Sequence, residues 1–164
     1  MKSQPQTIAE VFETASLGAP ENAIGFVLWR LAARYQRQAD RALTPLGVTN
    51  LQFVVLALVG WLGRSGDSVT QIELAQFGGI HPMQVSQTLK MLERKKLVKR
   101  RRSNSDTRAK QLQLTRTGLK TLHHALPIVI EVQSRLFGEA GRPGGSLLST
   151  LLLLEKKQVS AMAE

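Results

Sequence analysis

The chain has 164 residues, of which 43% are apolar and 21% charged, a composition that suits one folded domain with a core and room for an assembly surface. It contains no cysteine, which excludes disulfides, thiolate catalysis, cysteine-ligated zinc and sensors that oxidise their own thiol. The net charge is +10, and the segment from Lys90 to Lys120, with 12 basic and 2 acidic residues, carries all of it. Charge concentrated in this way predicts a polyanionic partner, with nucleic acid favoured over an anionic membrane surface.

The N-terminal residues 1–21 have neither the apolar core of a signal peptide nor the arginines of a transit peptide, and we treat them as an arm without an assigned role. The longest strongly apolar run, LQFVVLALVGWLG, has 13 residues, whereas a membrane-spanning helix needs about 20. We therefore expect a cytoplasmic protein without a membrane segment.

A long helix is predicted over residues 24–43, where apolar residues recur every three or four positions and Arg30, Arg34, Arg37 and Arg41 share another face. Pro45 and Gly47 interrupt it. A capping box from Thr49 to Gln52 then begins a second helix, which is apolar nearly all round and ends near Gly63. This second helix should be central, with these side chains in the core: Phe53, Val54, Leu56, Ala57 and Trp61.

The next two helices form a helix-turn-helix pattern. One begins at the capping box Thr70 to Glu73 and ends at Gly78 and Gly79, and the other begins at Pro82. Val85, Leu89 and Leu92 fall on one face of the second helix. The remaining surface carries groups suited to base edges and phosphates, since glutamine pairs with adenine and lysine with guanine: Pro82, Met83, Gln84, Ser86, Gln87, Lys90 and Arg94.

A β-hairpin is predicted to follow, with strands over residues 97–102 and 109–114 and the turn-forming segment SNSDT between them. Such a hairpin is a wing whose cations can contact DNA. An arginine on its tip can enter a narrow minor groove, and an aspartate two residues earlier can brace the turn or orient the guanidinium. The candidate wing residues are Lys99, Arg101, Arg102, Asp106, Arg108 and Lys110.

The last third of the chain is helical again. Thr115 is placed to cap a helix that includes Pro127, the segment GEAGRPGG at residues 138–145 breaks it, and Ser146 begins a final helix. The six leucines between Leu147 and Leu154 exceed one stripe, so the final helix needs partners on more than one side. We therefore expect it to complete a dimer interface.

Taken in chain order, these elements resemble the MarR family of bacterial transcriptional regulators over roughly residues 22–162. The most specific motifs are Asp106-x-Arg108 and Leu114-Thr115-x-x-Gly118 in and after the wing. The resemblance implies a mainly α fold with a small β-hairpin, that is, an α+β winged helix-turn-helix domain over residues 49–115. Residues 22–48 with 116–164 would form a helical dimerisation region.

The same resemblance implies a homodimer that binds double-stranded DNA at a pseudo-palindromic operator, most often as a repressor, and that a small aromatic or anionic effector releases. Arg108 would be the minor-groove arginine, Asp106 its orienting partner, and Pro82 to Lys90 the base-reading helix. Two positions depart from the family pattern. At the end of the recognition helix, Lys96 stands where the family commonly has a glycine, so either the helix ends differently or Lys96 contacts a phosphate. Before the turn, Gly78 stands where the family has an apolar residue, and Phe77 would have to supply the missing core contact.

The sequence says least about an effector. A cleft between the helical dimerisation region and the winged domain would place Trp29, Arg30 and Arg34 where they could hold an aromatic acid, although Trp29 also suits the core of a dimer interface. No cofactor, metal site or catalytic constellation is expected, and the protein is not expected to be an enzyme. Two alternatives stay open: a metal-responsive regulator using His123, His124 and Glu131, and a winged-helix protein that binds nucleic acid without sequence preference.

Overall fold

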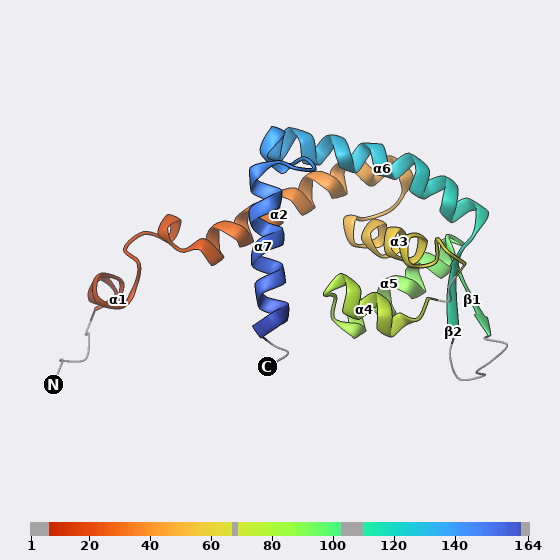
Figure 1. The fold of residues 1–164 in the computed structure, drawn as a ribbon, viewed down its shortest axis with the longest axis horizontal. Helices are drawn as coiled ribbons and strands as arrows, with labels where there is room; N and C mark the ends of the chain where they lie inside the picture. Colours follow the sequence, from red (N-terminus) through yellow and green to blue (C-terminus); the bar gives the residue numbers. More distant parts are fainter. Residues whose placement is uncertain (1–6, 67–68, 103–109, 162–164) are drawn as a thin grey trace. The chain divides into compact units, whose positions relative to one another are not determined.

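The computed structural model describes residues 7–66, 69–102 and 110–161, with the side chains of 101, 102, 110 and 157–161 outside that description. The chain divides into two compact units, Met1–Arg37 and Gln38–Glu164. The predicted fold class is confirmed: the described chain is mainly helical, with one two-stranded antiparallel sheet (Figure 1).

The first unit contains α1 (Ile8–Ala15), the short 3₁₀ helix η1 (Pro20–Asn22) and the beginning of α2 (Ile24–Leu43), which continues past Arg37 into the second unit. We did not predict α1. The sequence nevertheless contains a signal for its beginning, because Thr7 and Glu10 form a reciprocal capping box. No residue of α1 is buried, and Ile8 and Phe12 are exposed.

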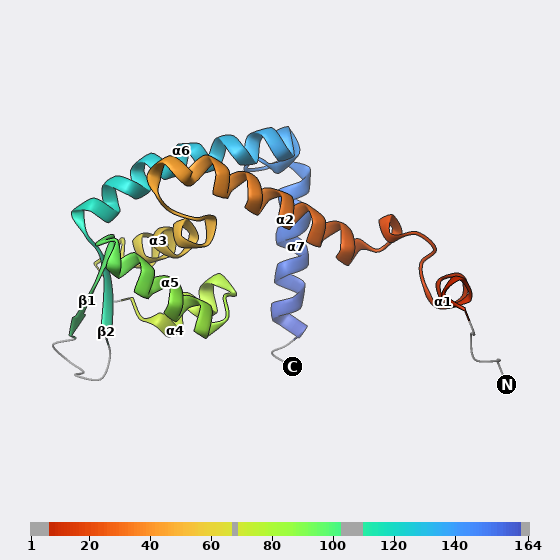
Figure 2. The same cartoon turned by 180° about the vertical axis from the view of Figure 1, so that it is seen from behind.

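The second unit is built on three helices, α3 (Asn50–Leu62), α4 (Gln71–Gly78) and α5 (Pro82–Arg94), which lie together in Figures 1 and 2. The capping boxes predicted at Thr49 and Thr70 are both present, and Pro82 occupies the first turn of α5. The helices enclose a core of fully buried side chains that includes Leu43, Leu56, Leu74, Leu89 and Leu92.

Two core predictions are wrong. Trp61 is 54% exposed, and the Arg64 guanidinium lies 3.8 Å from its ring centroid, so this tryptophan forms a surface cation–π pair. Phe77 is 61% exposed and does not replace the contact missing at Gly78. A Cβ on Gly78 would lie 2.8 Å from Leu58 Cδ1 and 3.0 Å from Ile80 Cδ1, so Leu58 and Ile80 already fill that space.

The wing consists of β1 (Val98–Arg102) and β2 (Lys110–Leu114), paired antiparallel with Val98 opposite Leu114 and Arg100 opposite Leu112. The loop after α3 adds a single bridge to this sheet, since the backbone N–H of Leu112 donates to the carbonyl of Val69 at 2.8 Å. We did not predict this bridge. It attaches the base of the wing to the helical core.

The wing leads directly into α6 (Arg116–Phe137), which Thr115 caps by accepting from the backbone N–H of Gly118. The helix continues through Pro127 and buries a face that includes Leu122, Ala125 and Val129. After the 3₁₀ helix η3 (Gly138–Gly141), α7 (Ser146–Ala161) begins at the predicted serine, and its leucines from 151 to 154 are all exposed in the single chain.

Among the described residues no single helix is both long enough and apolar enough to cross a membrane. One bent combination, 8–46 with Asn50–Leu62, passes such a test on length and composition alone.

Candidate nucleic-acid interface

The helix α5 presents the surface that the sequence predicts. Its apolar face is fully buried at Val85, Leu89 and Leu92, which fixes the opposite face toward solvent. Ser86 is half-buried, and the other residues predicted to face DNA are exposed: Pro82, Met83, Gln84, Gln87, Lys90 and Arg94. The described helix therefore offers two amides and two cations on one accessible side, and their role in reading bases stays a prediction.

The N-terminal end of α5 is held by a residue that we did not single out. His81 is the N-cap, and its Nδ1 accepts from the backbone N–H of Met83 at 3.3 Å. From α4, the side-chain amide of Gln71 lies 3.5 Å from the carbonyl oxygen of Pro82. The first turn of α5, where helices of this motif approach base edges, is thereby fixed against the preceding helix.

The C-terminal end of α5 shows how the helix ends with a lysine, Lys96, at the position where a glycine is expected. Lys96 has a φ of 57°, the left-handed conformation that a glycine would adopt more easily. The N–H of Leu97 donates to the carbonyl of Leu92, and the N–H of Lys96 to that of Glu93, both at 2.9 Å. This is the Schellman arrangement, so the helix ends at the expected place in spite of the substitution.

The wing places its first cations on two different faces. Lys99 is exposed, whereas Arg100 points back toward α5, and its Nε lies 2.8 Å from Glu93 Oε1 with both side chains largely covered. Strand alternation explains the difference, because Val98 and Arg100 share the inner face. Sequence reasoning missed this ion pair, although the alternation of residues 98–100 was available to find it.

The structure describes the other predicted wing residues only in part. Arg101, Arg102 and Lys110 belong to the paired strands. Asp106 and Arg108 lie outside the described residues, so the predicted minor-groove contact and its orienting partner remain predictions.

The motif Leu114-Thr115-x-x-Gly118 has a structural role at the base of the wing. The Thr115 hydroxyl donates to the carbonyl of Lys96 at 2.6 Å, and its backbone N–H donates to that of Leu97 at 3.0 Å. A Cβ on Gly118 would lie 1.9 Å from the same Leu97 oxygen. Only glycine at this position lets α6 approach the segment at the end of α5 so closely.

The residues predicted to hold an effector lie on α2. Trp29 is 67% exposed and stacks on Phe26 with ring centroids 6.2 Å apart, while the Arg30 guanidinium lies 5.5 Å from the centroid of Phe26. Glu21 also pairs with Arg30, at 3.5 Å. Arg34 is exposed one turn further along the helix. Phe26, which we had not singled out, joins the two predicted residues in one aromatic and cationic group.

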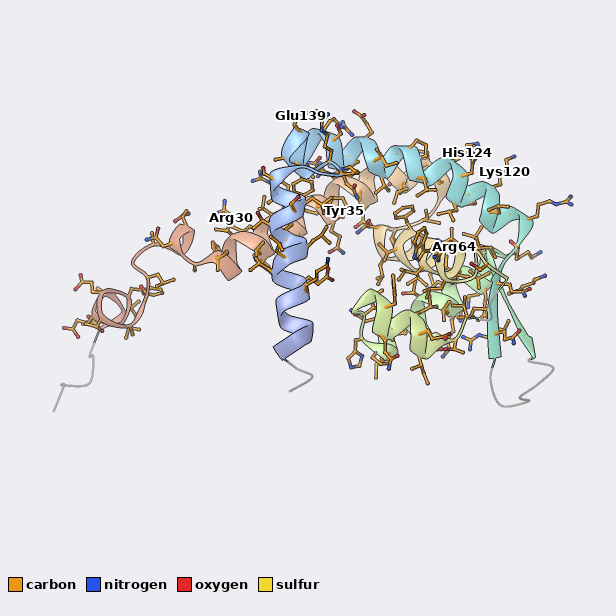
Figure 3. All side chains as sticks on the ribbon, in the orientation of Figure 1. Arg30, Tyr35, Arg64, Lys120, His124 and Glu139 are labelled. Atoms are coloured by element: carbon orange, nitrogen blue, oxygen red, sulfur yellow. The ribbon has the colours of Figure 1, made fainter. Side chains whose placement is uncertain are left out.

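The histidines on α6 do not converge on one point. The rings of His123 and His124 are arranged edge to face, with their centroids 5.6 Å apart. The Nδ1 of His124 lies 2.8 Å from the carbonyl oxygen of Lys120, and Figure 3 labels both residues on α6. Within the described part of the chain, no three histidine, aspartate or glutamate side chains are grouped so that they could hold a metal ion.

Comparisons with known proteins agree with this geometry. A model of the MarR family matches residues 46–109. Over 126 residues the chain is 32% identical to the uncharacterized HTH-type transcriptional regulator YdcH of Bacillus subtilis, an alignment that covers 77% of this chain and 86% of that protein.

Two solved structures illustrate the likeness in three dimensions. The Mycobacterium tuberculosis regulator MosR in complex with DNA aligns with a TM-score of 0.68 and 26% identity, covering 85% of this chain and 98% of that one. CouR from Rhodococcus jostii RHA1, bound to p-coumaroyl-CoA, gives the same TM-score and identity over 88% of this chain and 94% of that one. Matched in sequence and in the fold that carries the exposed helix and the wing, the chain belongs to the MarR family of DNA-binding, winged helix-turn-helix transcriptional regulators.

Proposed function

We propose that this regulator is a cytoplasmic homodimer that represses transcription by occupying a pseudo-palindromic operator, and that it has no catalytic role. The observation that carries the proposal is the exposed polar side of α5 beside a basic wing. A surface that binds polyanions only by charge needs no amides, whereas Gln84 and Gln87 can pair with base edges. In a dimer the two recognition helices would enter successive major grooves, roughly 34–36 Å apart.

The dimer is supported by apolar surface that the single chain leaves uncovered. On α7 the side chains of Leu151, Leu152, Leu153 and Leu154 are exposed, and so are Ile24, Leu28 and Leu31 on α2. Clustered apolar side chains exposed on one element, such as the four leucines of α7, mark protein contacts. We therefore propose that residues 22–48 with 116–164 form the dimerisation region, and that residues 49–115 form the DNA-binding domain.

The wing would grip the minor grooves that flank the major-groove contacts. Arg108 would enter the groove with Asp106 as its orienting partner, while Lys99, Arg101, Arg102 and Lys110 would contact phosphates. Arg108→Ala should weaken operator binding and flatten the preference for A·T-rich flanks, because a narrow A·T-rich groove concentrates the negative potential that attracts arginine. Unchanged operator affinity in this variant would contradict the wing assignment.

An aromatic acid or its thioester is the effector class that we propose. Trp29 and Phe26 offer stacking faces, Arg30 and Arg34 offer charge, and the similar regulator CouR has been solved with p-coumaroyl-CoA. Titration with aromatic acids should change tryptophan fluorescence and lower operator affinity together. A Trp29→Leu variant controls for the second tryptophan, Trp61, which lies outside this group.

Selection from a random duplex pool, with sequencing at two salt concentrations, tests the function as a whole. An enriched inverted repeat is expected from a site-specific dimer, and it would supply the operator. Salt-sensitive binding without an enriched sequence would instead identify a general polyanion contact, and the assignment of α5 as a reading helix would be wrong.

A further inference from the structure

Lys95, the C-cap residue of α5, is an exposed residue whose ammonium group is bonded to two acceptors of the protein itself. Its Nζ donates to the carbonyl oxygen of Gly47 at 2.5 Å and to Gln52 Oε1 at 2.7 Å. Both acceptors lie more than 40 positions earlier in the sequence, Gly47 in the turn between α2 and α3 and Gln52 in the first turn of α3. A residue of the basic segment therefore connects the end of α5 to the turn before α3 and to the first turn of α3.

The two acceptors are themselves held in place. Gln52 is only 7% exposed, and its Oε1 also accepts from the backbone N–H of Thr49 as part of the capping box. Gly47 ends the 3₁₀ helix η2 (Thr44–Leu46) with a φ of 66°. Asp40 Oδ1, near the end of α2, accepts from the backbone N–H of Asn50 at 2.6 Å. Lys95 is thus anchored to the backbone of a fixed turn and to a glutamine side chain that a capping box holds in place.

The contacts of Lys95 lie at the C-terminal end of α5, where a small change in the angle of the helix displaces its N-terminal end most. The residues expected to meet base edges begin at Pro82, at the opposite end of a 13-residue helix. Such a helix is about 20 Å long, so a tilt of about 5° at its C-terminal end displaces its N-terminal end by about 1.7 Å. A displacement of that size breaks a hydrogen bond to a base, whose usable range of lengths spans only about 0.5 Å.

We propose that Lys95 is a positioning residue for operator recognition: it sets the angle at which α5 enters the major groove and makes no contact with a DNA phosphate. Two of its three N–H donors are used by Gly47 and Gln52. Two other basic residues nearby have different surroundings: the side chain of Lys99 faces solvent, and Arg100 forms an ion pair with Glu93. The proposal rests on the proposed sequence-specific function.

The first test compares Lys95→Met with two variants that lose the same charge, Lys99→Met on the wing and Lys120→Met on the exposed surface of α6. Binding to the selected operator and to an unrelated duplex is measured over a range of salt concentrations. Loss of a phosphate contact lowers the slope of log K against log salt by about one unit on both duplexes, and we expect this for Lys99→Met. Lys95→Met should keep the wild-type slope on the unrelated duplex and lower operator affinity about tenfold, which corresponds to 1.4 kcal/mol. Lys120→Met should change neither quantity.

The second test is a double-mutant cycle in operator affinity with Lys95→Met and Gln52→Leu. If the two side chains act through the same contact, the double variant binds the operator about as weakly as Lys95→Met alone, and Lys95→Arg restores part of the affinity. Thermal unfolding of each variant shows that binding is measured on folded protein.

The possible outcomes separate the two proposals. If no operator is enriched from the random pool, the proposed function fails. If an operator is enriched but Lys95→Met lowers the salt slope on both duplexes, Lys95 is a phosphate contact and the positioning role is wrong. Unchanged operator affinity in Lys95→Met, or strictly additive effects in the double variant, would also overturn it.

Discussion

At the scale of single residues, Lys96 holds a conformation that costs a non-glycine residue about 1 kcal/mol. Its φ of 57° lies at the left-handed position of the Schellman end of α5. Lys96→Gly should remove most of this strain and raise the free energy of unfolding by up to about 1 kcal/mol, part of which the greater freedom of glycine in the unfolded chain offsets. Urea denaturation of the two proteins measures the difference.

The matched control is Lys90→Gly, which changes another exposed lysine to glycine within the regular part of α5. This variant should lose about 1 kcal/mol of stability, as glycine does in helix interiors. Equal losses at both positions would show that Lys96 is not strained. A large fall in non-specific DNA affinity for Lys96→Gly would instead support the phosphate contact that the sequence left open.

The wrong predictions for single residues concern large apolar side chains that were placed in the core and lie at the surface. Trp61 was assigned to the core because its helix is apolar nearly all round, and Phe77 because it would supply the contact missing at Gly78, yet both are exposed. Trp61 lies at the end of an almost entirely apolar helix, where periodicity does not distinguish the faces. The contacts of Lys95 could not be predicted either, because they join residues that only the tertiary fold brings together.

At the scale of elements, the junction between wing and α6 depends on one glycine. A Cβ on Gly118 would lie 1.9 Å from the carbonyl oxygen of Leu97, well inside contact distance. Gly118→Ala should therefore push α6 away from the end of α5 and destabilise the protein by 1–3 kcal/mol or more, the usual cost of overpacking about a methyl group. The midpoint of thermal or urea unfolding measures it.

Gly25 offers the comparison, since a Cβ there would meet nothing within 4 Å and the residue lies in the helix α2. Gly25→Ala should be neutral or should stabilise the protein by about 0.5–1 kcal/mol, because alanine is the better helix former. If Gly118→Ala were equally well tolerated, the close approach between α6 and the end of α5 would be wrong.

Element boundaries were the most predictable part of the fold. The boxes at Thr49 and Thr70, the proline that begins α5 and the serine that begins α7 all occupy the expected positions, because caps are read from neighbouring residues. The helix α1 was missed although Thr7 and Glu10 form the same kind of box. The bridge between Val69 and Leu112 was missed for another reason, since one paired residue leaves no periodic pattern.

At the scale of the whole molecule, the leucines of α7 from 151 to 154 are exposed, and none of the residues that the structure describes covers them. Leu152 and Leu153 are 45% and 60% exposed and point about 100° apart on the helix. The double variant Leu152→Glu/Leu153→Glu keeps residues that favour helices but would place charge in any apolar interface. If α7 completes the dimer, the dissociation constant should rise at least about a hundredfold, since burying each leucine contributes roughly 2 kcal/mol.

Sedimentation velocity over a range of protein concentrations measures the dissociation constant, and Ser65→Glu/Gln76→Glu provides a control that adds the same charge at exposed positions in the DNA-binding part of the chain. The control should remain dimeric. The leucine variant should also lose operator affinity while keeping its binding to a half-site, because the substituted leucines lie on α7 and not on α5 or the wing. Dimers that persist in the leucine variant would assign the interface to other surfaces and leave the exposed leucines for a different partner.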